Sequence, residues 1–227
     1  MTLQEAITCR HSVRRYTTQP IAETHIKALQ QQIDECNRLG GLHIQLVTNE
    51  TKAFTGILAY GKFANVANYI VMVGEKSTDL DERVGFYGEK LVLFAQTLGL
   101  NTCWVGLSYR KTDAYEVSSN EKLACMIAIG YGETQGVTHK IKTVNQVSNA
   151  DADSPAWFVS GVKAALLAPT AINQQKFSFE YIPPQSGGKA KVRAHKGFSM
   201  VGYTQMDLGI AKLHFELAAD KENFDWA

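Results

Sequence analysis

The sequence predicts an α+β fold in which helices pack on a mainly antiparallel sheet. Segments with helical spacing of apolar residues alternate with strand-like segments, but not as regular strand–helix–strand units. Neither GxGxxG nor GxxxxGK[ST] follows an expected strand, which argues against a Rossmann or P-loop nucleotide site. The 227 residues are 45% hydrophobic, enough for one large domain or two small ones.

Three helices are expected in the first 150 residues, from apolar spacing and from helix start and stop signals. They run from the capping box Thr2-x-x-Glu5 to about Ser12, from about Ile26 to Gly40-Gly41, and from Ser77-Thr78 to Gly99. Alternating apolar residues predict a strand over 42–48. A continuous apolar run over 68–74 predicts a strand buried on both faces, and 124–132 predicts another. Polar residues over 133–154 predict an exposed connection.

A second unit is expected over residues 151–227. Ser154 as cap and Pro155 as first helical residue predict a helix that continues to Ala168 and stops at Pro169. Strands are expected over 177–183 and 198–203, joined by a turn in "PPQSGGKAK". Thr204 and Asp207 have the spacing of a second capping box, which predicts a final helix to about Ala219.

Charge and composition exclude several classes of protein. The formal net charge is +1. Basic and acidic residues are nearly balanced both in residues 1–150 (15 basic, 14 acidic) and in residues 151–227 (8 and 8), so nucleic-acid binding is not expected. No apolar run approaches the roughly 18 residues of a membrane span. The four cysteines form no CxxC pair and follow no leader, which favours a reduced, cytoplasmic protein. The six histidines lack ligand spacing, so no metal site is expected.

The densest basic cluster, "RHSVRRYT" over 10–17, is the first candidate site. In an extended backbone the spacing of Arg10, Ser12 and Arg14 directs all three side chains the same way. Two guanidinium groups and a hydroxyl suit a phosphate. A solvated basic turn is the alternative interpretation.

Three further segments are candidates, each with a structural alternative. "LLAPTAINQQKF" (166–177) offers neutral donors and acceptors for a polar heterocycle, or is an ordinary helix exit. Trp104 beside Gly106 can wall a flat ligand, or is a core tryptophan. Lys140 and Lys142 add positive charge to an anion site if they fold back toward residue 10, or are solvated. Cys103 is expected to be a buried structural residue.

Taken together, these segments resemble the nitroreductase family, whose members are FMN-dependent oxidoreductases of α+β fold. "RHSVRRYT" resembles the family's R-x-S-x-R/K motif, "LGLNTCWVG" its G-L-G-T-x-W-x-G-like stretch, "AIGYGE…HKIKTVNQV" its strand ending with a trailing basic pair, and "APTAINQQKFSF" its A-P-S-x-x-N-x-Q-P-W-x-F signature. In a typical member the last motif follows the first long helix, where this chain has "RLGGLHIQLVTN". The chain therefore resembles a divergent subgroup with two related halves, 1–150 and 151–227, that together form one FMN-binding unit.

The resemblance implies a set of cofactor-binding residues. It assigns phosphate and ribityl contacts to the first motif and the trailing basic pair, contacts near the reactive flavin edge to the tryptophan segment, and contacts with the flavin ring to the second half. The residues so assigned are Arg10, His11, Ser12, Arg14, Lys140, Lys142, Val105, Gly106, Leu107, Pro169, Thr170, Ala171 and Asn173. The loop "YGKF" (60–63) is too weak a match to assign.

The implied function is electron transfer from NADH or NADPH through FMN to a nitroaromatic, a quinone or a similar acceptor. The cofactor carries this chemistry, so no catalytic side chain is assigned. Relatives of this fold also remove halogens, desaturate substrates or degrade flavin, and a flavin-binding or flavin-storage protein is the non-enzymatic alternative. The site is expected within one chain as a monomer, or across two chains of a homodimer.

Overall fold

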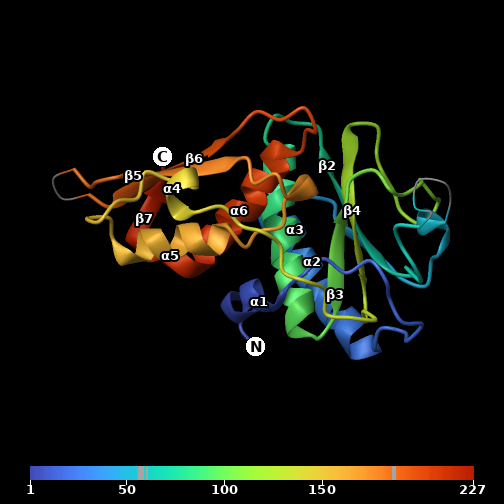
Figure 1. Cartoon of the computed structure of the whole chain (residues 1–227). Coiled ribbons are helices and arrows are strands. Elements are labelled where there is room, and N and C mark those ends of the chain that lie inside the picture. Colours follow the sequence, from blue (N-terminus) through green and yellow to red (C-terminus); the bar gives the residue numbers. More distant parts are fainter. Residues whose placement is uncertain (56–58, 60, 186–187) are drawn as a thin grey trace.

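The computed structural model describes residues 1–55, 59, 61–185 and 188–227 and confirms the α+β class (Figure 1). The first sheet has the strand order β1-β2-β4-β3, and each neighbouring pair is antiparallel. Its strands are β1 (Gln45–Val47), β2 (Tyr69–Glu75), β3 (Asn101–Val105) and β4 (Glu121–Gly130). Strand β2 is buried on both faces, as its continuous apolar run predicts.

The two faces of β2 belong to different parts of the core. Ile70 and Met72 pack with helices α2 (Glu23–Gly40) and α3 (Leu80–Thr97). Tyr69 and Val71 pack with Val13 and other residues of the segments that cover the opposite face. The sheet is therefore covered on both sides, by helices on one and by loops on the other.

Helix α1 (Leu3–Cys9) begins with the predicted capping box, in which Thr2 and Glu5 each bind the other's backbone N–H. It ends three residues earlier than predicted, because Arg10 is already extended (φ −71°, ψ 122°). The chain then runs alongside the first sheet, with an isolated bridge from Ser12 to Thr102 of β3. Residues 10–14 are thus fixed against the sheet as an extended segment.

The second part of the chain forms a smaller sheet with its own helices. Its strands are β5 (Phe177–Ile182), β6 (Ala190–Lys196) and β7 (Phe224–Trp226), in the order β5-β6-β7; β5 and β6 are antiparallel, and β6 and β7 are parallel. Its helices are α4 (Val144–Val147), α5 (Ala156–Ala165) and α6 (Thr204–Ala219). Short 3₁₀ turns cover Lys52–Phe54, Ala171–Asn173 and Lys221–Asn223.

Helices α3 and α6 join the two parts and lie side by side between the sheets (Figure 1). Gly85 of α3 faces the backbone of Met206, and Gly209 of α6 faces the backbone of Glu82. A Cβ atom at either glycine would overlap a carbonyl oxygen of the facing helix. The close approach of the two helices therefore requires these glycines.

The hairpin prediction placed the second strand too late. The partner of β5 is β6, where Ala190 and Val192 alternate with exposed charged residues, and not 198–203. Phe198 and Met200 are 86% and 95% exposed, so these two apolar residues do not belong to a buried strand. The predicted turn between the strands includes residues 186–187, which lie outside the described residues.

Three other predictions at the ends of elements were wrong in detail. Pro155, not Ser154, is the cap of α5, and neither side chain caps it. Tyr203 is the cap of α6, and Asp207 faces the chain after α5 instead of forming a capping box. The connection over 133–154 contains helix α4. Across the described helices, none has the length and apolar character of a membrane span.

Candidate functional site

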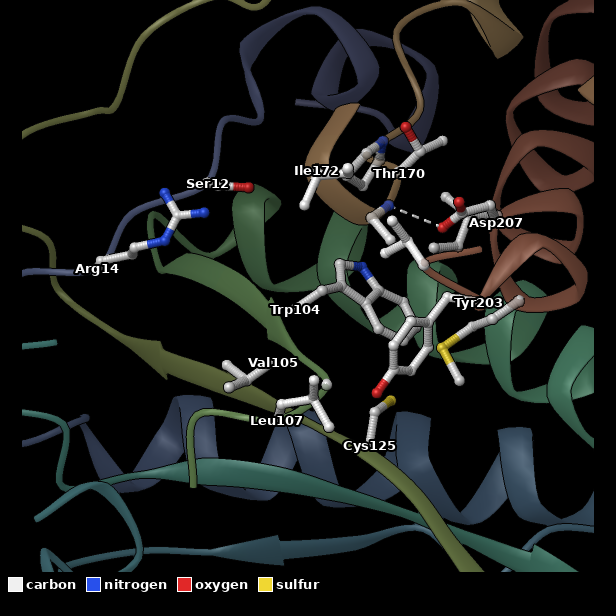
Figure 2. A pocket seen from close by; sticks show the side chains of 16 residues that line it. Ser12, Arg14, Trp104, Val105, Leu107, Cys125, Thr170, Ile172, Tyr203 and Asp207 are labelled. Atoms are coloured by element: carbon white, nitrogen blue, oxygen red, sulfur yellow. Dashed lines mark hydrogen bonds between the residues drawn. The ribbon is translucent and has the colours of Figure 1, made fainter. Parts of the chain in front are cut away.

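A cavity of about 250 Å³ lies between the first sheet and the start of α6 (Figure 2). It brings together segments on both sides of residue 150. The side chains and backbone around it belong to Ser12, Arg14, Trp104, Val105, Gly106, Leu107, Cys125, Pro169, Thr170, Ala171, Ile172, Val201, Tyr203, Met206, Asp207 and Ile210. Eight of these belong to the motif residues singled out from the sequence: Ser12, Arg14, Val105, Gly106, Leu107, Pro169, Thr170 and Ala171.

The basic cluster divides between two environments. Ser12 and Arg14 line the cavity, and the Arg14 guanidinium forms no ion pair with any described residue. Arg10 instead is 3% exposed, and its Nε lies 3.7 Å from Glu89 Oε1. Burial lowers the pKa of Arg10, which the Glu89 carboxylate opposes. Arg10 and His11 line a separate cavity of about 180 Å³.

Glu89 lies at the centre of a buried polar cluster with Arg10, Trp104 and His214. Its carboxylate accepts from Trp104 Nε1 at 2.8 Å and lies 2.9 Å from His214 Nε2, while His214 Nδ1 lies 3.1 Å from the Ala164 carbonyl oxygen. Both nitrogens of the His214 ring thus face oxygen atoms, one of the Glu89 carboxylate and one of the Ala164 carbonyl group. The cluster fixes the indole of Trp104, which walls the cavity.

The end of β3 forms the wall next to the sheet. Trp104 and Val105 are the last residues of the strand, Gly106 and Leu107 follow it, and Leu107 is 75% exposed at the cavity. A Cβ atom on Gly106 would lie 2.6 Å from the Tyr203 ring, so the ring packs directly on the Gly106 backbone. Figure 2 shows the rings of Trp104 and Tyr203 among the side chains that line the cavity.

The segment that follows α5 forms the opposite wall. Ile172, Asn173 and Gln175 all have positive φ angles, of 47°, 58° and 45°. Such backbone costs free energy for residues other than glycine, most of all for β-branched isoleucine, and persists only where surrounding contacts hold it. Ile172 is 78% exposed at the cavity.

The remaining motif residues of the second half hold this segment and do not line the cavity. Asn173 Nδ2 donates to the Lys140 carbonyl oxygen at 2.9 Å. Gln175, which is 3% exposed, donates to the same oxygen and accepts from the Lys142 N–H. Lys142 Nζ donates to the Gln175 carbonyl oxygen at 2.6 Å, and Lys140 is exposed. The trailing basic pair thus lies against the 169–175 segment.

Asp207, in the first turn of α6, is a cavity residue that the sequence analysis did not assign. It is 3% exposed, and its carboxylate accepts from the Ala171 N–H at 3.0 Å and from Gln174 Nε2 at 2.6 Å. Burial raises its pKa to about 6, although both donors oppose the shift. Its position three residues after Thr204 is the spacing of a capping box, so no sequence signal distinguishes it as a cavity residue.

A second cavity of about 420 Å³ adjoins the first and shares Arg14, Trp104, Val105 and Gly106 with it. Lys62 also lines the second cavity and donates to Ser108 Oγ at 3.3 Å. Arg14 and Lys62 give this end of the combined space a positive charge. No cluster of metal-ligating side chains occurs among the described residues, and the four cysteines are free thiols.

Comparison with known proteins agrees with the fold. A family model described as "Putative TM nitroreductase" matches residues 2–219. A solved structure from Thermotoga maritima described as "a putative nitroreductase" is 25% identical, with a TM-score of 0.63, and the match covers 96% of this chain and 83% of that chain. No curated protein sequence matches this one significantly.

Two other solved structures resemble the chain over a smaller share of its length. A nitroreductase family protein from Streptococcus pneumoniae is 12% identical, with a TM-score of 0.50, over 64% of this chain and 98% of that chain. A "putative nitroreductase in complex with fmn" from Desulfovibrio desulfuricans is 13% identical, with a TM-score of 0.47, over 68% and 98%. Because the family model spans nearly the whole sequence, the chain belongs to the nitroreductase family.

Proposed function

We propose that this protein is an FMN-dependent oxidoreductase that passes electrons from NADH or NADPH to a nitroaromatic, a quinone or a similar acceptor. Membership of the nitroreductase family supports an oxidoreductase. The observation that carries the proposal is the cavity that joins Ser12 and Arg14 to the 105–107 and 169–171 backbone.

The residues present fit FMN. Arg14 has a guanidinium without an ion-pair partner among the described residues, and Lys62 adds a second cation beside it, which suits the anionic and polar part of the cofactor. The rings of Trp104 and Tyr203 and the apolar side chains around them suit a flat ring system. Bound there, FMN would supply the chemistry of hydride transfer between NAD(P)H and the acceptor.

The chain's own residues have separate tasks in this proposal. Ser12 and Arg14 bind the phosphate and ribityl oxygens. Val105 to Leu107 and Pro169 to Ala171 present backbone to the ring from opposite sides. Arg10 pairs with Glu89 and so holds the segment that carries Ser12 in place. Asn173 donates to the Lys140 carbonyl oxygen and so holds the 169–175 segment.

Titration with FMN and with riboflavin, which lacks the phosphate, tests the proposal. Arg14→Ala is expected to weaken FMN binding by about 1.5–3 kcal/mol, the cost of a hydrogen bond to a charged group, and riboflavin binding far less. Arg15→Ala is the matched control, because Arg15 pairs with Glu133 at 2.8 Å and lines neither cavity. Equal losses for both ligands would contradict a phosphate role.

Turnover separates the enzyme from its alternative. The oxidation of NADH and NADPH is measured by absorbance with and without menadione as acceptor. Acceptor-dependent oxidation supports the proposed function. Tight FMN binding without oxidation of either nucleotide would favour the flavin-storage alternative, and a protein that binds no flavin would exclude both.

A further inference from the structure

Asp207 is a buried carboxyl group in the wall of the cavity. Its two oxygens accept from the Ala171 N–H and from the Gln174 side chain, and no cation pairs with it among the described residues. Figure 2 shows Asp207 and Arg14 on opposite sides of the cavity. Asp207 therefore lies in the wall of the cavity away from Arg14, bonded to the 169–171 backbone.

Reduction of an acceptor in this cavity requires a proton. A quinone that takes up a hydride becomes an oxyanion, and the surroundings are largely apolar, with Val201, Met206 and Ile210 among them. An unneutralised oxyanion is costly there. A proton donor within the wall removes that cost.

The other polar groups around the cavity do not meet this need. Arg14 is permanently protonated and gives up no proton near neutral pH. Burial raises the pKa of the Cys125 thiol and of the Tyr203 phenol, so both are weaker acids than usual. The hydroxyls of Ser12 and Thr170 are weaker still. Asp207 is the remaining acid among the described cavity residues.

We propose that Asp207 is the catalytic proton donor to the acceptor, a role that rests on the proposed function. The quinone would take up its two electrons as a hydride, which bound FMN would supply. The O–H bond of the Asp207 carboxyl breaks as an O–H bond forms at the quinone oxygen, which gives the hydroquinone. The carboxylate that remains keeps its bonds to the Ala171 N–H and Gln174 and regains a proton from water.

The environment of Asp207 supports this role. Its pKa of about 6 lies near working pH, where a general acid is most effective. Burial and the two hydrogen bonds account for its shifted pKa, and charged groups of the neighbouring elements have other partners. Glu82 binds Gln205 and Lys212, Glu89 is enclosed with Arg10 and His214, and Lys142 binds the Gln175 carbonyl oxygen.

A role confined to holding the 169–175 segment is the competing explanation, and a pair of acceptors separates the two. Menadione needs a proton with its electrons, whereas ferricyanide takes electrons alone. FMN-loaded protein is reduced with dithionite, and reoxidation of the flavin is followed by stopped-flow absorbance. Below about pH 6, Asp207→Asn is expected to slow reoxidation by menadione about 100-fold, within the range for a positioned general acid, and reoxidation by ferricyanide less than about twofold.

The pH profile and two further variants sharpen this test. The wild-type rate with menadione should fall about tenfold for each pH unit above 6, and the Asp207→Asn rate should be flat. Asp207→Glu should restore the slope. Asp153→Asn, which removes an exposed carboxylate outside the cavity, should behave as wild type.

A measurement on the protein without cofactor gives an independent readout. The difference in infrared absorption between wild type and Asp207→Asn should show a protonated carboxyl as pH falls through about 6. An Asp207 that stays ionised down to about pH 4 has no proton to give and overturns the proposal. Equal slowing with both acceptors, or slowing with neither, also overturns it while FMN binding stands. A wild-type protein that binds no FMN overturns the proposed function itself.

Discussion

Arg10 and Arg14 are four positions apart in one basic motif, yet they have opposite environments. Arg14 is exposed at the cavity, whereas Arg10 is 3% exposed beside Glu89, and its Nε has no hydrogen-bond partner. A buried guanidinium is tolerated only when a charge of opposite sign accompanies it. The carboxylate of Glu89 is therefore what allows the chain to bury the start of the motif against α3.

The Arg10–Glu89 pair predicts a non-additive effect on stability. In Glu89→Gln the amide can still accept from Trp104 and donate to a neutral His214, so the main loss is the charge opposite Arg10. Leaving a buried charge unpaired costs about 3–5 kcal/mol in the free energy of unfolding. The double variant Arg10→Met, Glu89→Gln should recover most of this loss in urea denaturation.

An exposed ion pair provides the control for these Arg10 and Glu89 variants. Lys122 lies 2.8 Å from Asp81 with both side chains more than a third exposed. Lys122→Met should cost less than about 1 kcal/mol. Additive losses at Arg10 and Glu89 would show that the two groups do not depend on each other.

The raised pKa of Asp207 predicts that its contribution to the free energy of unfolding decreases as pH rises. Its pKa is raised from 3.8 to about 6 on folding, so the folded protein binds more protons than the unfolded chain between these values. The stabilisation is fully present below about pH 3.8 and is lost as pH rises through about 6, by up to about 3 kcal/mol.

Comparison with Asp207→Asn isolates this contribution, because groups such as Asp79, whose pKa is lowered, act in the opposite direction in both proteins. Between about pH 4 and pH 7, the free energy of unfolding of the wild type should decrease relative to that of the variant. A difference that is constant over this range would mean that Asp207 keeps an ordinary pKa.

At the scale of elements, the 169–175 segment shows how side chains hold a costly backbone. Three residues with positive φ stand within four positions, and none of them is glycine. Gln175 is the main support: its Oε1 accepts from the Lys142 N–H, and its Nε2 donates to the Lys140 carbonyl oxygen and to Asn173 Oδ1. These bonds tie the exit from α5 to the connection before it.

Gln175→Ala should destabilise the protein by about 1–3 kcal/mol, because it leaves the Lys142 N–H and the Lys140 carbonyl oxygen with fewer partners in a partly buried place. Asn173→Gly keeps the left-handed backbone available. It removes the bonds of Asn173 to the Lys140 carbonyl oxygen and to Gln175 Nε2, but these two groups still bind each other, so it should cost less than about 1 kcal/mol. Thermal unfolding of both variants measures this order. The reverse order would show that Asn173 is the main support.

At the scale of the whole molecule, the close packing of α3 on α6 places both motif-bearing parts around one cavity. Ser12 and Arg14 come from the first part, and Pro169 to Ala171 come from the second. This arrangement leads us to expect one FMN per chain in a monomer.

Light scattering on the FMN-loaded protein after size-exclusion chromatography tests this expectation. The mass should be that of one chain, with one flavin by absorbance, and it should not change on dilution. Flavin that is retained only in dimers, and lost together with them on dilution, would indicate a site shared between two chains.

The sequence by itself determined those elements that depend on residues close together in the chain. The capping box of Thr2 and Glu5 predicted the start of α1 correctly, because hydrogen bonds within a few residues produce it. The continuous apolar run predicted β2, because burial on both faces requires such a run. The motif resemblance likewise led to the nitroreductase family, which the family model matches.

The tertiary structure alone decided how side chains in those motifs are used. Nothing in "RHSVRRYT" indicates that Arg10 lies beside Glu89 and Arg14 at the cavity, because Glu89 is 79 positions away and reaches Arg10 only once α1 packs on α3. Asp207 has a capping-box spacing from Thr204 but binds Ala171, 36 positions earlier. Burial and charge pairing depend on contacts between distant segments, so the sequence determined which residues can do chemistry, and packing determined which of them face the cavity.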